Sequence, residues 1–166
     1  METIRRCRDG DRAQILAIIN AAAEAYRGVI PADRWHEPYM TAEALDREFA
    51  AEVEFWCYTR GDALLGVMGI QPARGVDLIR HAYVLPASQG SGIGSALLRH
   101  LRQRSPRRML VGTWAAASWA IRFYERHGFV LVEPETKTEL LKRYWTIPDR
   151  QIATSVVLAD PPLDAN

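Results

Sequence analysis

The residues with the clearest chemical meaning form a glycine-rich segment, Gln89-Gly90-Ser91-Gly92-Ile93-Gly94-Ser95. The apolar residues 82–84 before it predict the end of a buried strand, and Pro86 stops the ladder because it has no N–H to donate. Apolar residues at helical spacing then predict a helix over residues 93–104. Glycines lack a Cβ, so the backbone N–H groups of such a loop can turn inward, and a helix N-terminus attracts anions. The segment therefore predicts a phosphate site.

Two common phosphate motifs do not fit this segment. No Gly-Lys-Ser/Thr follows the glycines, so it is not a P-loop. Gly90 and Gly92 match the start of a dinucleotide fingerprint, but its third glycine falls on Ser95, and no acidic residue follows about 20 residues later. A glycine-rich turn that binds no ligand is the alternative interpretation.

Two motifs resemble those of the GNAT superfamily of acetyl-CoA-dependent N-acyltransferases. Gln-x-x-Gly-x-Gly at residues 89–94, just after a Val-x-Pro strand end, is similar to the pyrophosphate loop of that superfamily. Residues 120–129, Ala-Ile-Arg-Phe-Tyr-Glu-Arg-His-Gly-Phe, are similar to its Ala-x-x-Phe-Tyr-x-x-x-Gly-Phe helix. The resemblance extends over roughly residues 2–158. It implies an N-acetyltransferase that takes acetyl-CoA as co-substrate and works by direct attack in a ternary complex.

The resemblance also implies how acetyl-CoA binds. In the family, the strand before the loop splays from its neighbour, and the amide arm of CoA pairs with its free backbone groups like an added strand. The N–H groups of the loop then hold the diphosphate, and a glutamine at position 89 adds hydrogen bonds rather than a charge. The family often has an asparagine where this chain has Ala117. The cofactor-binding residues implied in this way are Ala82, Tyr83, Val84, Gln89, Gly90, Ser91, Gly92, Ile93, Gly94, Ser95, Ala117, Ala120 and Tyr124.

Tyr124 is the first candidate for catalysis. Helical spacing puts it on one face with Ala117, Ala120 and Ile121, and the alanines leave room for a thioester beside the phenol. The resemblance implies that Tyr124 protonates the departing CoA thiolate, a fair leaving group because a thiol has a pKa of about 8.5. Helical spacing alone favours the alternative, a tyrosine that packs its ring and points its hydroxyl at water.

The general base is less well defined. Family members often carry a glutamate on the strand before the loop, and the matching position here is Leu78. His81 lies on the same strand, and histidine is the side chain that titrates near neutral pH, so we take it as the second catalytic candidate. A structural histidine is the alternative interpretation. Asp77 and Arg80 are the other nearby candidates on this strand, and Glu37, His36 and a chain of waters are further alternatives for the base.

Aromatic and charged side chains gather in residues 26–40, where two prolines and a glycine argue against one regular element. Loops of this composition often line sites, and a lid that only packs on the core is the alternative. We expect the acceptor to contact Trp35, Glu37, Tyr39 and Trp114. Such a pocket suits a small-molecule amine or an amino-acid-like acceptor. The rival functions are a catalytically weak CoA-binding regulatory or interaction module, and an enzyme that binds a nucleotide phosphate.

A group of arginines follows the start of the loop helix. They form a solvated basic face in one interpretation, and in the other one or two of them meet the adenosine phosphate of CoA. The group consists of Arg99, Arg102, Arg104, Arg107 and Arg108.

Composition bounds the remaining possibilities. The chain has 166 residues and a net charge of +1, which gives no electrostatic case for nucleic acid or a membrane surface as partner. No apolar run approaches a membrane span and the N-terminus lacks the apolar core of a signal peptide, so a cytoplasmic location is the default expectation. Cys7 and Cys57 predict free thiols, and no Cys/His cluster has metal-binding spacing, so no metal is expected. Whether the protein forms a homodimer stays open.

The order of the expected elements is that of an α+β fold. Strands are expected over residues 3–8, 55–60, 63–71, 77–84, 108–114, 129–132 and 152–158, and helices through 15–22, 41–53, 93–104, 117–127 and 135–144. With the resemblance, they predict a single-domain GNAT-like fold: a central mixed, mostly antiparallel twisted sheet, flanked by helices and splayed between the strands near 77–84 and 108–114. The domain is expected over residues 1–159, with a C-terminal tail over 160–166. The helical segment before the last strand is expected to cover one side of the site.

Overall fold

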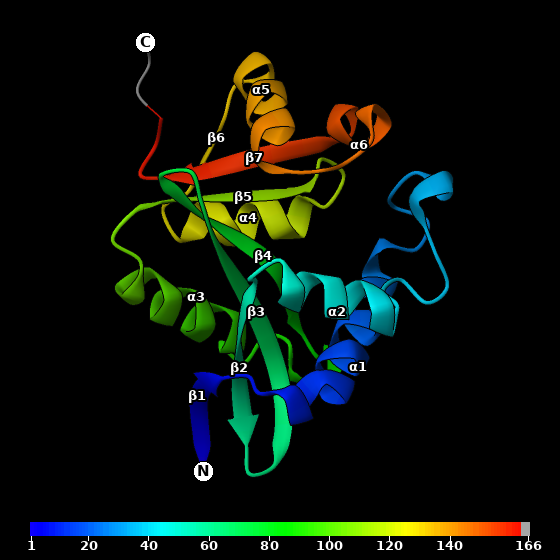
Figure 1. The fold of residues 1–166 in the computed structure, drawn as a ribbon, viewed down its shortest axis with the longest axis vertical. Helices are drawn as coiled ribbons and strands as arrows, with labels where there is room; N and C mark the ends of the chain where they lie inside the picture. The colour runs from blue at the N-terminus through cyan, green and yellow to red at the C-terminus, as the bar shows by residue number, and fades with distance from the viewer. Residues whose placement is uncertain (164–166) are drawn as a thin grey trace.

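The chain folds around one seven-stranded sheet (Figure 1) in the order β1-β2-β3-β4-β5-β7-β6. The structure is a computed structural model and describes residues 1–163. All neighbouring strands are antiparallel except β4 and β5, which are parallel, so the predicted mixed, mostly antiparallel sheet is confirmed. The strands are β1 (Glu2–Arg6), β2 (Glu54–Arg60), β3 (Ala63–Ala73), β4 (Val76–Val84), β5 (Arg108–Trp114), β6 (Val130–Leu131) and β7 (Ser155–Asp160).

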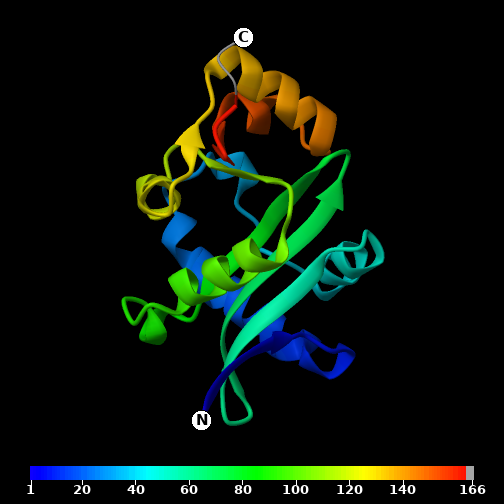
Figure 2. The same ribbon diagram turned by 90° about the vertical axis from the view of Figure 1, so that its left-hand side faces the viewer.

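Helices cover both faces of this sheet. They are α1 (Arg12–Ala22), α2 (Ala42–Ala50), α3 (Ile93–Arg104), α4 (Ser118–Arg126), α5 (Pro134–Tyr144) and α6 (Asp149–Ala153). Short 3₁₀ turns occupy Asp9–Asp11, Ala23–Tyr26, Ala32–Arg34 and Pro86–Ser88. Figure 2 shows α3 on the side of the sheet opposite α1. None of the helices within residues 1–163 combines the length and the apolar character that crossing a membrane requires.

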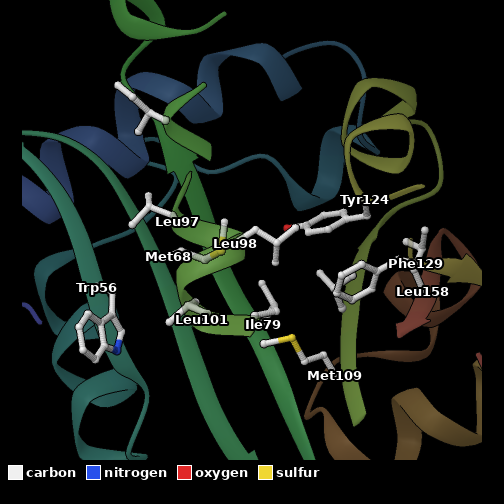
Figure 3. Packing of buried hydrophobic residues seen from close by; sticks show 12 residues of the cluster. Trp56, Met68, Ile79, Leu97, Leu98, Leu101, Met109, Tyr124, Phe129 and Leu158 are labelled. Atoms are coloured by element: carbon white, nitrogen blue, oxygen red, sulfur yellow. The ribbon is translucent and has the colours of Figure 1, made fainter. Parts of the chain in front are cut away.

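Alternating side chains of the strands fill two separate cores. In β2, Trp56 packs with α3, whereas Phe55 and Cys57 pack with α1 and α2, as the period of two in a strand requires. Figure 3 shows the core under α3 and α4, in which the Tyr124 ring lies among Leu98, Ile79 and Phe129. A third cluster joins α5 to β5 and β7. These contacts fix α3 and α4 on one face and α1 and α5 on the other.

The sheet opens between β4 and β5. The two strands pair over four residues, from Val76 opposite Arg108 to Ile79 opposite Val111. Beyond this point β4 pairs with β3 alone, through a register shift at which His81 takes a left-handed backbone with φ +54°. A β-bulge bends its strand, so β4 turns away from β5. The predicted splay between these strands is confirmed.

The end of the chain differs from the expected elements. Ile152, which we expected at the start of the last strand, lies in α6, and β7 begins at Ser155. Pro148 followed by Asp149 is a helix start signal that explains α6. β7 continues to Asp160, which we assigned to the tail, and residues 164–166 of that tail lie outside the described part of the chain.

Two local features near other strands depart from the usual preferences of their residues. Pro72 does not break its strand: β3 runs through it, since β2 pairs with β3 only as far as Ile70 and leaves that side of Pro72 without a neighbouring strand. Asp11 does not cap α1, because its carboxylate accepts hydrogen bonds from the Arg5 guanidinium at 2.8 and 3.0 Å. The Thr41 side chain caps α2 by accepting a hydrogen bond from the Ala44 N–H at 3.1 Å.

Candidate active site

A cleft of about 580 Å³ opens at the glycine-rich segment, and we call it the loop cleft. Its walls come from the end of α1, the second half of β4, the start of α3 and α4. It is lined by Ala22, Ala25, Tyr26, Val67, Met68, Ala82, Tyr83, Val84, Ser88, Gln89, Gly90, Gly92, Ile93, Gly94, Ser95, Trp119, Ala120, Phe123, Tyr124 and Arg126. The two matched motifs therefore meet across one cleft.

The glycine-rich segment presents backbone N–H groups at the mouth of α3. Gly90 and Gly92 have φ of +81° and +86°, values that residues with a side chain rarely adopt. Gly92 is the N-cap residue of α3, and its carbonyl accepts the first helical bond from Ala96 at 2.9 Å. The N–H groups of Ile93, Gly94 and Ser95 have no acceptor within the described residues. This row of free donors suits a diphosphate.

Gly94 serves a different purpose from the two other glycines of the motif. A Cβ on Gly94 would lie 3.3 Å from the Phe123 ring, so the missing side chain allows α3 and α4 to approach each other. Its φ is not in the left-handed region, in contrast to that of Gly90 and Gly92. Gly94 therefore sets the width of the loop cleft, and the other two set its backbone path.

Polar side chains around the loop mostly hold the loop itself. The Gln89 amide donates to the Val84 carbonyl at 3.2 Å, and the Ser91 hydroxyl donates to the Ser88 carbonyl. Ser91 does not line the cleft. The Ser95 hydroxyl lies 2.8 Å from Nε2 of His127, whose pKa is lowered by burial and by neighbouring arginines.

The arginine that lines the loop cleft is Arg126, which the sequence analysis did not single out. Four members of the predicted group are engaged elsewhere. Arg102 pairs with Asp160 at 3.1 Å, Arg107 pairs with Asp77, Arg104 lies over the Trp56 ring at 4.5 Å, and Arg108 donates to the Pro161 carbonyl at 3.0 Å. Arg126 follows Trp119 by seven residues and Phe123 by three, and this helical spacing is the signal that would have identified it.

A second, smaller cavity of about 200 Å³ lies in the splay between β4 and β5, and we call it the phenol cavity. It is lined by Tyr26, Tyr39, Ile79, Arg80, His81, Ala82, Tyr83, Val111, Gly112, Thr113, Trp114, Ala120, Tyr124, Leu141, Trp145, Ile147, Gln151 and Ser155. Tyr26, Ala82, Tyr83, Ala120 and Tyr124 belong to the walls of both spaces. The two spaces therefore meet at the Tyr124 phenol.

Tyr124 is held in place by two aromatic neighbours. Its ring meets those of Phe123 and Phe129 edge to face, at centroid distances of 5.1 and 5.5 Å. Burial, with a smaller effect of Tyr26, raises the pKa of the Tyr124 hydroxyl well above its ordinary value of about 10. The hydroxyl is therefore protonated at neutral pH and can act as a proton donor.

Three more tyrosines line the phenol cavity together with Tyr124. The Tyr26 ring lies 5.6 Å from that of Tyr39 and 6.4 Å from that of Tyr83. The Trp114 indole N–H donates to the Tyr39 hydroxyl at 3.3 Å. Burial raises the pKa of Tyr26 to about 12 and also raises those of Tyr39 and Tyr83. All of these phenols remain neutral, so the cavity wall here offers hydroxyl groups and ring faces rather than charges.

The segment between β6 and β7 roofs the phenol cavity, as the sequence analysis expected. Leu141, Trp145, Ile147 and Gln151 come from this segment. It is tied to the loop before α2, because Arg34 donates to the Gln151 side chain at 3.1 Å and Arg150 pairs with Asp33 at 2.9 Å. These contacts hold α6, which carries Gln151 of the cavity wall, against the loop before α2.

The predicted acceptor residues divide into two pairs. Tyr39 and Trp114 line the phenol cavity, but Trp35 and Glu37 line neither space. The Glu37 carboxylate accepts from the Trp35 indole at 3.0 Å and from Arg27 at 2.8 Å, and its side chain is 65% exposed. His36 is exposed and also lines neither space, so both loop alternatives for the general base lie away from Tyr124.

The structure also places Ala117, a predicted cofactor-binding residue, and His81, a predicted catalytic residue. Ala117 is fully buried before α4, where it packs with Ile30 and Trp114 and does not reach the loop cleft. His81 lines the phenol cavity, and its Nε2 lies 3.4 Å from a carboxylate oxygen of Glu48. The structure thus brings His81 and Tyr124 to the walls of one cavity.

Comparison with known proteins agrees with this geometry. Residues 20–142 match the family model described as "Acetyltransferase (GNAT) domain". A curated relative is the peptidyl-lysine N-acetyltransferase YiaC of Escherichia coli, 26% identical over 145 residues that cover 83% of this chain and 92% of the relative.

Solved structures of acetyltransferases have the same fold. The PaiA N-acetyltransferase of Thermoplasma acidophilum, in complex with coenzyme A, superposes with a TM-score of 0.72 at 15% identity, covering 96% of this chain and 98% of that one. A GNAT family acetyltransferase of Brucella melitensis, in complex with acetyl-CoA, gives a TM-score of 0.57 at 26% identity, covering 78% and 83%. The chain belongs to the GNAT family, and it is an N-acetyltransferase that uses acetyl-CoA as its acyl donor.

Proposed function

We propose that this enzyme acetylates the primary amine of a small molecule that enters the phenol cavity. The observation that carries the proposal is that the loop cleft and the phenol cavity share the wall around Tyr124. An acyl donor in the first space and an amine in the second would meet at this phenol. Holding two reactants together in this way removes much of the entropic barrier to their reaction.

The loop cleft is the donor site in this proposal. Its free N–H groups at Ile93, Gly94 and Ser95 would hold the diphosphate, with Arg126 nearby. The half of β4 that has no β5 partner, residues 80–84, would pair with the amide arm. Acetyl-CoA supplies an activated acyl group as a thioester. The residues of the chain bind and orient the two reactants and transfer the protons.

Tyr124 and His81 divide the proton chemistry. Tyr124, buried and neutral, donates its proton to the sulfur of the leaving thiolate. His81, on the wall of the phenol cavity, takes a proton from the attacking amine. No cysteine lies on either wall among the described residues, which supports direct transfer to the amine without an acyl-cysteine intermediate.

The size of the phenol cavity favours a small acceptor. Its volume of about 200 Å³ lies below the roughly 300–1,000 Å³ of sites for drug-sized ligands. The Arg34–Gln151 and Arg150–Asp33 contacts hold α6 against the loop before α2 beside it. Among the described residues no Asp or Glu lines it, so phenol oxygens and aromatic faces would hold the amine.

A protein lysine is the second candidate acceptor. The curated relative is named a peptidyl-lysine N-acetyltransferase, and a lysine side chain is narrow enough to place only its amine inside a small cavity. In this case the peptide backbone would rest outside, on the roof formed by α6 and the loop before α2.

An acceptor panel separates the two candidates. The enzyme, with saturating acetyl-CoA, is assayed for thiol release with aliphatic amines, aromatic amines, amino acids and a lysine-containing peptide, with the same peptide acetylated on lysine as control. A small amine is expected to give the highest kcat/KM. A lysine peptide that exceeds every small amine by about tenfold or more would replace the proposal with peptidyl-lysine acetylation.

A further inference from the structure

We propose that Glu48 of α2 is a positioning residue for His81, holding the ring so that one of its nitrogens can take the proton of the acceptor amine. This inference rests on the proposed function, in which His81 is the general base. Glu48 itself lines neither the loop cleft nor the phenol cavity. It acts on the reaction only through His81.

The backbone at His81 is held in an unusual conformation. A φ of +54° is uncommon for a residue with a side chain, and residues kept in such conformations often lie at functional sites. The position belongs to the bulge that turns β4 away from β5. Across the sheet, Gly69 leaves space for this path, since a Cβ there would lie 2.8 Å from the Arg80 carbonyl. The bulge therefore fixes where the His81 side chain begins.

Contacts on the α2 side fix the direction of the ring. The imidazole stacks on Phe55 with centroids 5.9 Å apart and planes inclined by 23°. Nε2 is buried, and Glu48 Oε2 at 3.4 Å is close enough for an ion pair but not for a well-formed hydrogen bond. Of the two ring nitrogens, only Nε2 is both buried and without a hydrogen-bond partner. The nitrogen assigned to the substrate is therefore Nδ1.

Glu48 carries a negative charge at neutral pH. Burial opposes its ionisation, but contacts with His81 and Arg80 outweigh burial, so the pKa of Glu48 lies below its ordinary value. Its side chain is 21% exposed, which leaves the charge only partly screened by water. This carboxylate therefore faces the His81 imidazole as a negative charge.

The other groups around the ring do not replace Glu48. Arg80 donates to the Gln71 side chain at 3.0 Å and reaches Glu48 at 3.5 Å, so it shares the carboxylate with His81. Arg47 adds a more distant positive charge from α2. On the cavity side, Tyr26, Tyr39 and Tyr83 are neutral. Glu48 is thus the negative charge in contact with the imidazole.

The proton step balances with these groups alone. An N–H bond of the acceptor ammonium breaks and an Nδ1–H bond forms on His81, which leaves the electron pair on the amine nitrogen for attack on the thioester carbon. The charge on the ring is then compensated by Glu48. As the C–N bond forms and the C–S bond breaks, the Tyr124 hydroxyl gives its proton to the thiolate. The nitrogen then loses its second proton to the Tyr124 oxygen as the amide forms, and His81 releases the first proton to water.

The test is the pH dependence of kcat/KM for the acceptor, measured by thiol release for the full chain. In Glu48→Gln kcat is expected to fall about tenfold across the profile, while the KM for acetyl-CoA stays unchanged. Glu48→Asp, which keeps the charge, should restore part of this loss. Glu43→Gln, an exposed change on the same helix, should leave the profile unchanged. A Glu48→Gln variant with lowered thermal stability but an unchanged kcat would show a merely structural role and overturn the proposal.

His81→Asn separates this inference from the proposed function. Asparagine tolerates a left-handed backbone and has no titrating ring, so the bulge is preserved while the base is lost. A loss of about a hundredfold in kcat/KM, with a flattened acidic limb, is expected. An unchanged profile in His81→Asn would remove the base itself. A changed profile in His81→Asn with none in Glu48→Gln would remove only the positioning role of Glu48.

Discussion

The loop cleft and the phenol cavity adjoin each other but are built by different means. The loop cleft owes its binding groups to the backbone: its donors are N–H groups of Ile93, Gly94 and Ser95, which follow one another in the chain. The phenol cavity is made of side chains from residues 26 to 155, contributed by both faces of the sheet. In the proposed function, the first binds the acyl donor that the family shares. The second must recognise one acceptor.

This difference explains how each half can be altered. A backbone site tolerates side-chain changes but depends on the conformations that its glycines allow. A side-chain site keeps its frame when one residue changes, but its shape and polarity change with that residue. Substitutions in the two halves should therefore produce separable kinetic effects. Only residues on the shared wall should affect both.

The largest effect is expected at the shared wall, in Tyr124→Phe. Loss of the proton donor should lower kcat by roughly a hundredfold while the affinity for acetyl-CoA stays within about twofold of wild type, because the ring remains. Steady-state kinetics and a direct acetyl-CoA titration check this. A wild-type kcat would remove Tyr124 from the chemistry.

The pKa of Tyr124 adds a pH criterion to the same experiment. Because burial raises this pKa above 10, the wild-type donor stays protonated through pH 10, and no basic limb should arise from it below that value. Ionisation of Tyr124 at high pH should also lower the stability of the folded protein. The buried, neutral form contributes fully below the unfolded-state pKa of about 10, and its contribution is lost as the pH rises further. A basic limb of kcat near pH 8 that disappears in Tyr124→Phe would contradict this assignment.

A smaller and one-sided effect is expected from Gly92→Val. A β-branched residue does not fit the φ of +86° at this N-cap, although a Cβ would meet nothing within 4 Å. The N–H groups of the loop should shift, raising the KM for acetyl-CoA about tenfold and leaving the acceptor KM unchanged. Gly75→Val, with a φ of +79° and equally open surroundings in the β3–β4 turn, is the matched control. Equal KM changes in both variants would mean that strain, not the loop, is responsible.

The smallest effect is expected in the phenol cavity, from Gly112→Ala. The added Cβ would lie 3.3 Å from the Trp145 ring and 3.5 Å from Leu141, so the roof must move by a few tenths of an ångström. We expect the acceptor KM to change about threefold, with no change in the KM for acetyl-CoA. Competition kinetics with two acceptors of different size would show whether the cavity has changed shape. A change confined to the acetyl-CoA KM would break the division between the two spaces.

The same division explains what could be predicted from sequence. The donor half is local: residues 89–95 and 120–129 each form one motif, so their resemblance to the motifs of the family was enough to predict their place in the fold. The acceptor half could be predicted only where an aromatic residue happened to face inward, as Tyr39 and Trp114 do. Trp35 and Glu37 lie in the same aromatic and charged segment as Tyr39, but Glu37 accepts hydrogen bonds from Trp35 and Arg27 instead of facing the cavity. Their spacing in the sequence does not indicate this.

Charged residues were the least predictable part of the site. Glu48 lies 33 residues before His81 in the chain, and only the packing of α2 beside β4 brings the two together. Residue type does not distinguish Arg126, which lines the loop cleft, from Arg102 and Arg107, which form ion pairs with aspartates. Their roles depend on which partner the fold places within reach. Long side chains choose partners in three dimensions, so spacing along the chain has little power here.

The unpaired edge of β4 has a consequence for the stability of the protein. From Arg80 to Val84 one edge of this strand finds no neighbouring strand within residues 1–163, so in the free protein water must satisfy it. A bound donor supplies the absent edge and favours the folded state by mass action, by about 2.7 kcal/mol at a concentration one hundred times its Kd. Resistance of the purified protein to proteolysis should therefore rise with the acetyl-CoA concentration.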